Sequence, residues 1–217
     1  MKIKILLLTA FTAAGVLLFS SSLMALGLGV YGTAAKGPIS WTYTNEDTDA
    51  ETDVDSDISK FGLGFTLDTT LAYDRLFNYR LHVGYSKLKI DNEENLENIE
   101  GWDFHLYNSF GFGVFRSQPV RIWLGPQIGF GVISAEYDND NLSKNSFTTL
   151  FFSLGAIAGV NFNVSDLVTI AVDGGYRFNW HTGWVSRGNY DYELSGKGKE
   201  AFMDVAFMFR VGGDQFQ

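Results

Sequence analysis

Ionisable side chains are scarce in the apolar segments of this chain, and the few that occur there are the first candidates for chemistry. Asp173 and Arg177 stand four residues apart, and Asp204 lies in a later apolar segment. Asp68 and Arg80 form a second set of opposite charges. Charges buried among apolar residues must be paired or hydrated. These residues therefore predict either an ion-pair network that stiffens a protein interior or a narrow hydrated path with a charge gate.

The segments that carry these charges alternate between apolar and polar residues with a period of two, which indicates β-strands. Eight such segments lie near 26–43, 61–71, 77–90, 101–115, 120–136, 147–163, 167–180 and 200–211. Long polar connectors alternate with short ones; the long ones are 44–60, 91–100, 137–146 and 181–199, and the short ones are 72–76, 116–119 and 164–166. This alternation predicts an up-and-down antiparallel meander with long loops at one end. The tight turns and both termini then lie at the other end.

The stretch 78–87 shows which strand face points inward. Its bulky residues are Tyr79, Leu81, Val83 and Tyr85, and Arg80 and His82 lie on the opposite face. A soluble barrel of the lipocalin type would place the bulky face inside, whereas a transmembrane barrel places it against lipid. Eight strands enclose room only for modest side chains, so the bulky faces of all strands cannot point inward. We therefore predict an eight-stranded antiparallel transmembrane β-barrel with the polar face inside.

Two sets of residues follow from this orientation. The predicted interior polar network comprises Asp68, Arg80, His82, Asp103, His105, Gln127, Asp173, Arg177 and Asp204. Within this network, Arg177 is expected within pairing distance of Asp173 or Asp204. The second set is an interfacial aromatic belt of Trp41, Trp102 and Trp180, which all fall at strand ends on the long-loop side. Tryptophan is enriched where a membrane meets water, so this placement supports the lipid-facing orientation.

Segments such as RIWLGPQIGFGV and LGAIAGVNFNVSDLVTIAVDGGYRF, together with the alternation of loops, give the chain a family resemblance. It resembles the small eight-stranded outer-membrane barrels of diderm bacteria, the OmpA/OmpX/OmpW type. The resemblance implies a bacterial outer-membrane location with both termini in the periplasm. It also implies outer-membrane lipid and the barrel-assembly machinery as partners. The last strand, Ala201 to Val211, resembles the strand that this machinery reads, although Gly212 to Gln217 follow it.

The first 25 residues have the composition of a secretory signal peptide. Lys2 and Lys4 precede a mostly apolar run from Ile5 to Phe19. The next stretch, Ser20 to Ala25, contains small residues and is a plausible cleavage region, with the cut expected after Ala25. The alternative is a retained membrane helix. The sequence thus predicts a signal peptide over residues 1–25 and one barrel domain over residues 26–217.

The charge distribution limits the kinds of partner that the chain is expected to bind. The formal net charge is −9, which argues against nucleic acid because phosphate binding needs clustered Lys and Arg. Of 25 acidic residues, 18 lie in or beside the long connectors. The run of alternating acids from Asp49 to Asp57 does not fit an EF-hand, because a loop starting at Asp53 has Ile58 at position 6 and Gly64 at position 12. The connectors 44–60 and 181–199 are expected to meet divalent cations or a host or surface protein.

No catalytic or cofactor-binding motif stands out. The chain has no cysteine, and it contains neither HExxH nor GxSxG. A remote alternative is a lipid A-modifying rim site built from His181, Ser186 and Glu193. The sequence therefore predicts no enzyme, cofactor or metal site. The favoured function is a structural or surface-interaction barrel with acidic extracellular loops, and the alternative is a narrow porin-like channel for small or apolar solutes.

Overall fold

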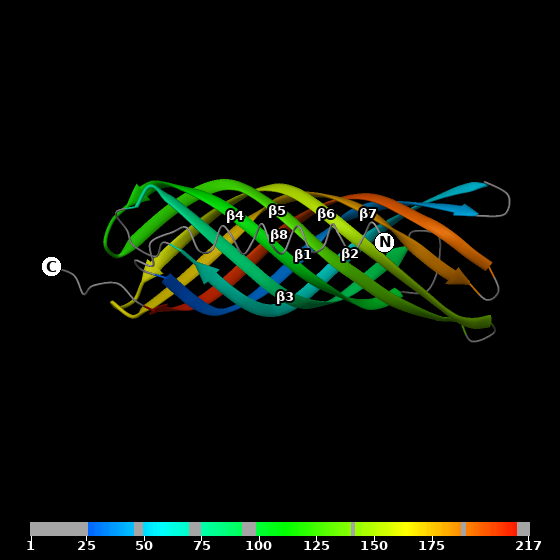
Figure 1. Ribbon diagram of the computed structural model, residues 1–217, viewed down its shortest axis with the longest axis horizontal. Helices are drawn as coiled ribbons and strands as arrows, with labels where there is room; N and C mark the ends of the chain where they lie inside the picture. Colours follow the sequence, from blue (N-terminus) through cyan, green and yellow to red (C-terminus); the bar gives the residue numbers. More distant parts are fainter. Residues whose placement is uncertain are drawn as a thin grey trace, which may run out of the picture.

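The chain forms a closed barrel of eight antiparallel strands joined in sequence order (Figure 1). The computed structural model describes residues 26–45, 50–69, 75–92, 99–139, 142–187 and 190–211. The predicted signal peptide, residues 1–25, lies outside the described residues. The strands are β1 (Leu26–Asn45), β2 (Glu51–Asp68), β3 (Phe77–Asn92), β4 (Ile99–Arg116), β5 (Val120–Asn139), β6 (Leu142–Asn163), β7 (Val168–Arg187) and β8 (Tyr190–Val211). The predicted fold, an up-and-down meander closed by pairing of β1 with β8, is confirmed.

The pairing register fixes how the strands tilt. Successive paired neighbours of Ala35 around the ring are Lys60, Leu88, Gly101, Ala135, Phe147, Val185, Tyr192 and finally Asn45. The path returns to β1 at residue 45 rather than residue 35, a stagger of ten residues. With strands about 4.8 Å apart and a rise of about 3.3 Å per residue, this stagger corresponds to a tilt of about 40°. Moving from a residue to its paired neighbour on the next strand therefore changes the height along the barrel axis by the equivalent of about 1.25 residues. The heights of residues on different strands can be compared on this scale.

Three of the four predicted long connectors, 44–60, 137–146 and 181–199, are mostly strand, so this part of the prediction was wrong for them. β2 begins at Glu51 inside the expected loop 44–60, and β7 and β8 extend through almost all of 181–199. Period-2 alternation continues through these segments, but with polar residues outside, so they do not show the bulky face used to define the strands. The three hairpins β1–β2, β5–β6 and β7–β8 extend the barrel at one end (Figure 1).

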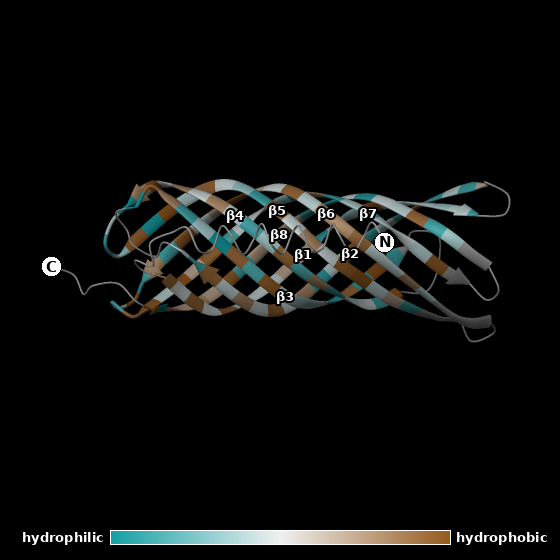
Figure 2. Ribbon diagram, viewed as in Figure 1, coloured by the Kyte–Doolittle hydropathy of each residue, from teal (hydrophilic) through white to brown (hydrophobic). Residues whose placement is uncertain are grey.

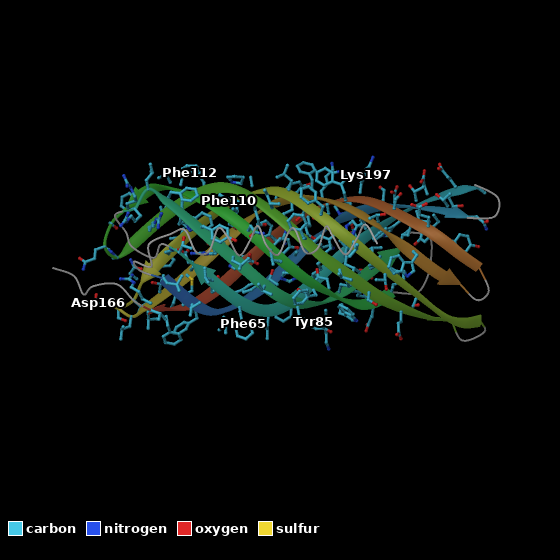
Figure 3. All side chains as sticks on the ribbon, viewed as in Figure 1. Phe65, Tyr85, Phe110, Phe112, Asp166 and Lys197 are labelled. Carbon is cyan, nitrogen blue, oxygen red and sulfur yellow. The ribbon has the colours of Figure 1, made fainter. Side chains whose placement is uncertain are left out.

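Apolar residues are more frequent along the strands in the other part of the barrel (Figure 2). Exposed apolar side chains form a band around the outside of this part. It runs from Phe77, Phe162 and Phe209 at the tight-turn end up to Trp102 and Trp180, all of them 39% or more exposed. After correction for the stagger, the two edges of the band are about eleven residues apart along the barrel axis, or roughly 28 Å. Transmembrane barrels carry an apolar band of about 25 Å. Phe65 and Tyr85 project outward within the band, and Lys197 projects outward beyond it (Figure 3).

The strands continue beyond this band. From the level of Trp102 and Trp180 to the tips of β1, β2, β6 and β8 is about eight residues of height, or roughly 20 Å. We call this part the extension. Its outward-facing acids include Glu51, Asp53, Asp55, Glu136 and Glu193. The chain ends of the described barrel meet at the opposite end, where Leu26 pairs with Val211.

Candidate functional site

The candidate site is the ionic interior of the barrel within the apolar band. All nine residues of the predicted interior network are buried, none more than 2% exposed. They come from six strands, and the period of two turns them inward while the bulky residues face out. Because their side chains carry almost no water-accessible surface, the lumen is filled at their level.

Arg80 organises the cluster nearer the tight turns. Its guanidinium pairs with Asp68, 2.7 Å away, and with Asp173 on the far side of the barrel. It also donates to the side-chain oxygen of Asn161 at 2.8 Å. The indole of Trp123 lies 5.0 Å from the guanidinium carbon and is fully buried. One cation thus holds two carboxylates from β2 and β7, which cross-links opposite walls.

A second cluster lies nearer the extension and centres on Lys60. The Lys60 ammonium lies 3.1 Å from Asp103 and 3.3 Å from Glu200. Glu200 also pairs with Arg177, whose Nε is 2.9 Å from a carboxylate oxygen. The Arg177 guanidinium carbon lies 3.8 Å from the ring centroid of Tyr107 and 4.0 Å from that of Phe202. The alternating charges therefore form one chain across β2, β4, β7 and β8.

Two histidines extend the second cluster toward the first. His105 pairs with Asp103 at 2.9 Å, and its other ring nitrogen is hydrogen-bonded to the Tyr31 hydroxyl at 2.7 Å. Tyr31 stacks on His82, with ring centroids 4.2 Å apart. His82 lies 3.5 Å from Asp204. The remaining residue of the network is Gln127, which donates to Ser109 at 3.0 Å and accepts from Arg177 at 3.4 Å.

The structure corrects the expected partner of Arg177. Asp173 is held by Arg80 and Asp204 by His82, so the carboxylate beside Arg177 is Glu200. The prediction missed Glu200 and Lys60 because both stood at the edges of presumed loops. The period of two could have identified both residues, because it places Glu200 on the same strand face as Asp204 and Lys60 on the same face as Asp68.

Above the ionic clusters, the interior of the extension is mostly apolar. Its buried cluster comprises Ile39, Trp41, Ile58, Leu88, Ile90, Ile133, Ala135, Phe147, Phe151 and Leu194, and it continues downward to Tyr107 beside Arg177. Outside at this level are mostly acids and other polar residues, together with Trp184, which is 53% exposed. The two faces therefore exchange character at the top of the apolar band: below it the barrel is apolar outside and ionic inside, and above it the arrangement is that of a soluble barrel.

Trp41 belongs to this inner cluster and not to the aromatic belt, so its predicted place was wrong. It is 2% exposed, whereas Trp102 and Trp180 are 39% and 42% exposed. Trp41 lies on β1 about three residues higher than the other two, where the apolar face already points inward. Its ring packs against Phe147, with centroids 5.9 Å apart.

The remote rim site does not assemble. His181 points into the barrel and is 5% exposed, with its ring 5.1 Å from that of Trp41 and 5.7 Å from that of Phe151. Glu193 faces outward. The side chain of Ser186 lies outside the described part of the chain. The barrel wall thus separates the histidine from the acid that was expected to assist it.

Among the described residues, no group of three or more His, Asp and Glu side chains could hold a metal ion. No helix in that part of the chain is long and apolar enough to cross a membrane.

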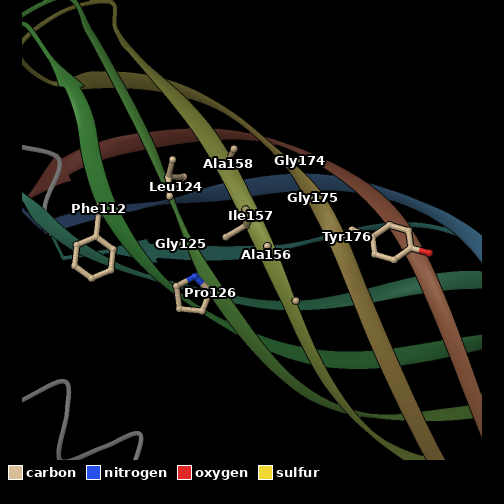
Figure 4. A pocket seen from close by; sticks show the side chains of 11 residues that line it. Phe112, Leu124, Gly125, Pro126, Ala156, Ile157, Ala158, Gly174, Gly175 and Tyr176 are labelled. Carbon is tan, nitrogen blue, oxygen red and sulfur yellow. The ribbon is translucent and has the colours of Figure 1, made fainter.

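A shallow groove of about 710 Å³ lies in the outer wall across β5, β6 and β7 (Figure 4). The groove lies between Leu124 and Tyr176, where small residues such as Ala156, Ala158 and Gly174 leave space unfilled. Apart from the Tyr176 hydroxyl, its lining side chains carry no hydrogen-bonding group. Such a lining suits hydrocarbon chains but cannot fix the orientation of a polar ligand.

The closed ring, the apolar band and the ionic interior define an eight-stranded transmembrane β-barrel. No protein-family model and no curated protein matches the chain.

Several solved structures are similar. Neisserial surface protein A (NspA) is 17% identical, with a TM-score of 0.35 over 81% of this chain and 96% of that one. The outer membrane protease OmpT from Escherichia coli is 9% identical, with a TM-score of 0.46 over 89% and 99% of the two chains. Ail, the attachment invasion locus protein of Yersinia pestis, is 10% identical, with a TM-score of 0.35 over 83% and 98%. At these levels the likeness concerns the fold, which the strand order establishes directly.

Proposed function

We propose that this protein is a bacterial outer-membrane barrel that serves as a closed structural and surface-interaction element. The observation that carries the proposal is the filling of the lumen at two levels. Arg80, Trp123 and Arg177 fill the ionic level, and Ile90, Ile133 and Leu194 fill the apolar level, each 2% exposed or less. A conducting pore needs a continuous hydrated path, and these layers oppose one.

The extension supplies the surface that would meet a partner. Its acids face outward on rigid paired strands, as where Asp53 accepts a 2.7 Å hydrogen bond from Thr42 on the neighbouring strand. A fixed array of carboxylates suits divalent cations or a basic surface on another protein. The hairpins within 44–60 and 181–199 are the proposed contact sites. Both chain ends would lie in the periplasm, and the alternating last strand would be read by the barrel-assembly machinery.

Conductance in planar bilayers tests the closed lumen. The mature chain, refolded and shown by heat-modifiable gel migration to be a barrel, should give no steady openings. Reproducible unitary conductance would instead support the narrow-channel alternative. Protease shaving of intact cells tests the orientation, since cleavage between Asn45 and Glu51 from outside would place the extension at the cell surface.

A further inference from the structure

Five lysines whose side chains are described on the barrel exterior lie at two adjacent heights. Corrected for the stagger, Lys36, Lys87 and Lys199 fall within about one residue of the same height, and Lys89 and Lys197 lie about two residues above them. Trp102 and Trp180 stand between these two heights. Acidic residues begin just above, with Glu100 and Glu136. The outer face therefore carries a positive tier where the apolar band ends.

Part of this tier borders a hollow of about 610 Å³ on the outer face of β2, β3, β4 and β5, here called the boundary hollow. Phe61 and Tyr85 form its apolar lower side. The Trp102 ring stacks on Tyr85 with centroids 6.0 Å apart and stands between Lys87 and Lys89 in height. The polar part of the hollow carries Lys87 and Lys89 together with Ser59, Ser134, Glu100 and Glu136. The hollow is therefore amphipathic, with its apolar side continuous with the lipid-facing band.

We propose that the boundary hollow binds the headgroup of a membrane lipid that carries phosphate and sugar hydroxyl groups. Lys87 and Lys89 would contact the phosphate, because an ammonium near a membrane surface attracts anionic headgroups. Glu100 and Glu136, slightly higher, would accept hydrogen bonds from hydroxyl groups. Phe61, Tyr85 and Trp102 would face the junction of headgroup and acyl chains. The continuity with the apolar band favours a lipid over a free phosphorylated sugar.

The ionic contacts of the lysines fit this role. Lys89 pairs with Asp91 at 3.0 Å, but both side chains remain more than 40% exposed. Among the described residues, no ion pair involves Lys87, Lys197 or Lys199. Lys197 and Lys199 lie at the same tier on β8, away from the hollow, and so provide a matched comparison. The inference rests on the proposed membrane placement, but not on the closed lumen or the acidic extension.

The test compares apparent affinities by native mass spectrometry of the full mature barrel in detergent micelles. The probes are a lipid with a phosphorylated disaccharide headgroup, the same lipid after dephosphorylation, and the phosphorylated disaccharide without acyl chains. The wild type should bind the phosphorylated lipid about tenfold or more tightly than either other probe. Lys87→Gln with Lys89→Gln should weaken that binding about 10- to 30-fold, as expected from about 1 kcal/mol per lysine.

The control is Lys197→Gln with Lys199→Gln, which removes the same charge at the same height and should change the affinity less than about threefold. Equal losses in the two double variants would overturn the site, because they would show a diffuse charge effect. Equal binding of phosphorylated and dephosphorylated lipid would also overturn it. If the chain is instead soluble without detergent, the membrane placement itself fails, which separates that failure from a failure of the hollow.

Discussion

Tyr85 and Leu88 are three residues apart on β3, and both are large and apolar, yet they lie on opposite sides of the barrel wall. Tyr85 is 50% exposed toward the apolar band, whereas Leu88 is 3% exposed inside the extension. The apolar face of the strand has therefore changed sides between them. This change marks the level where the barrel leaves the surroundings of lipid and enters those of water.

Replacing each of these two residues should give unequal costs. Leu88→Ala removes packing from a closed apolar core and should lower the free energy of unfolding by about 2–5 kcal/mol. Tyr85→Ala opens space toward lipid, whose chains can fill it, so its cost should be less than half as large. Urea unfolding of the barrel in lipid vesicles measures both. A larger loss for Tyr85→Ala would contradict the assigned level of the boundary.

Arg80 should be the most sensitive charged position. Arg80→Gln removes the cation that Asp68 and Asp173 share, and breaking a buried pair in this way costs about 3–5 kcal/mol. Adding Asp68→Asn and Asp173→Asn to the same chain should recover much of the loss, since uncompensated charge is then removed.

Lys36→Gln is the control for this series. Its pair with Asp57 spans 3.8 Å with the lysine side chain 69% exposed, and such surface pairs contribute about 0–1 kcal/mol. Unfolding experiments that find no recovery in the triple variant would show that packing by Arg80, rather than its charge, holds the cluster.

The sequence was sufficient to predict the barrel because bulky residues predominate on the outer face of the strands within the apolar band, although single rings such as Trp123 and Phe202 lie inside. Phe61, Leu63 and Phe65 on β2 show it clearly, each 68% exposed or more. The interior residues followed by parity alone. Their partners did not follow, because a pair such as Arg80 and Asp173 joins strands β3 and β7, which are not neighbours. Only the stagger and the side-chain lengths decide such contacts.

The extension escaped prediction for a physical reason. Above the band, water replaces lipid outside, so Ile58 and Ile90 turn inward while Asp57 and Asp91 face outward. A search for one continuous apolar face therefore ends each strand too early, and the polar remainder resembles a loop. The same assumption put Trp41 outside. A prediction that let the apolar residues move from the outer to the inner face at the level of Trp102 would have placed the ends of β1 and β3 correctly.

Gly196 tests the fit of Trp41. A Cβ at Gly196 would stand 2.6 Å from the Trp41 ring, so Gly196→Ala should force the indole to shift. Overpacking of this kind costs about 1–3 kcal/mol. Gly32→Ala is the matched control, because its Cβ would meet nothing closer than 3.7 Å and faces lipid; it should change stability by about 0.5 kcal/mol or less. Equal effects in urea unfolding would contradict the packing of Trp41 against β8.

Fluorescence quenching by brominated lipids distinguishes tryptophans at the boundary from those inside. In variants that keep one tryptophan and carry phenylalanine at the other four positions, Trp102 and Trp180 should be strongly quenched, because both rings face lipid near the interface. Trp41 and Trp123 should be quenched several-fold less, since they are 2% and 0% exposed inside the barrel. Moving the bromine along the acyl chain should place Trp102 and Trp180 at the same shallow depth, as tryptophans of an interfacial belt require. Strong quenching of Trp41, or different depths for Trp102 and Trp180, would show that the tilt and the boundary derived from the strand register are wrong.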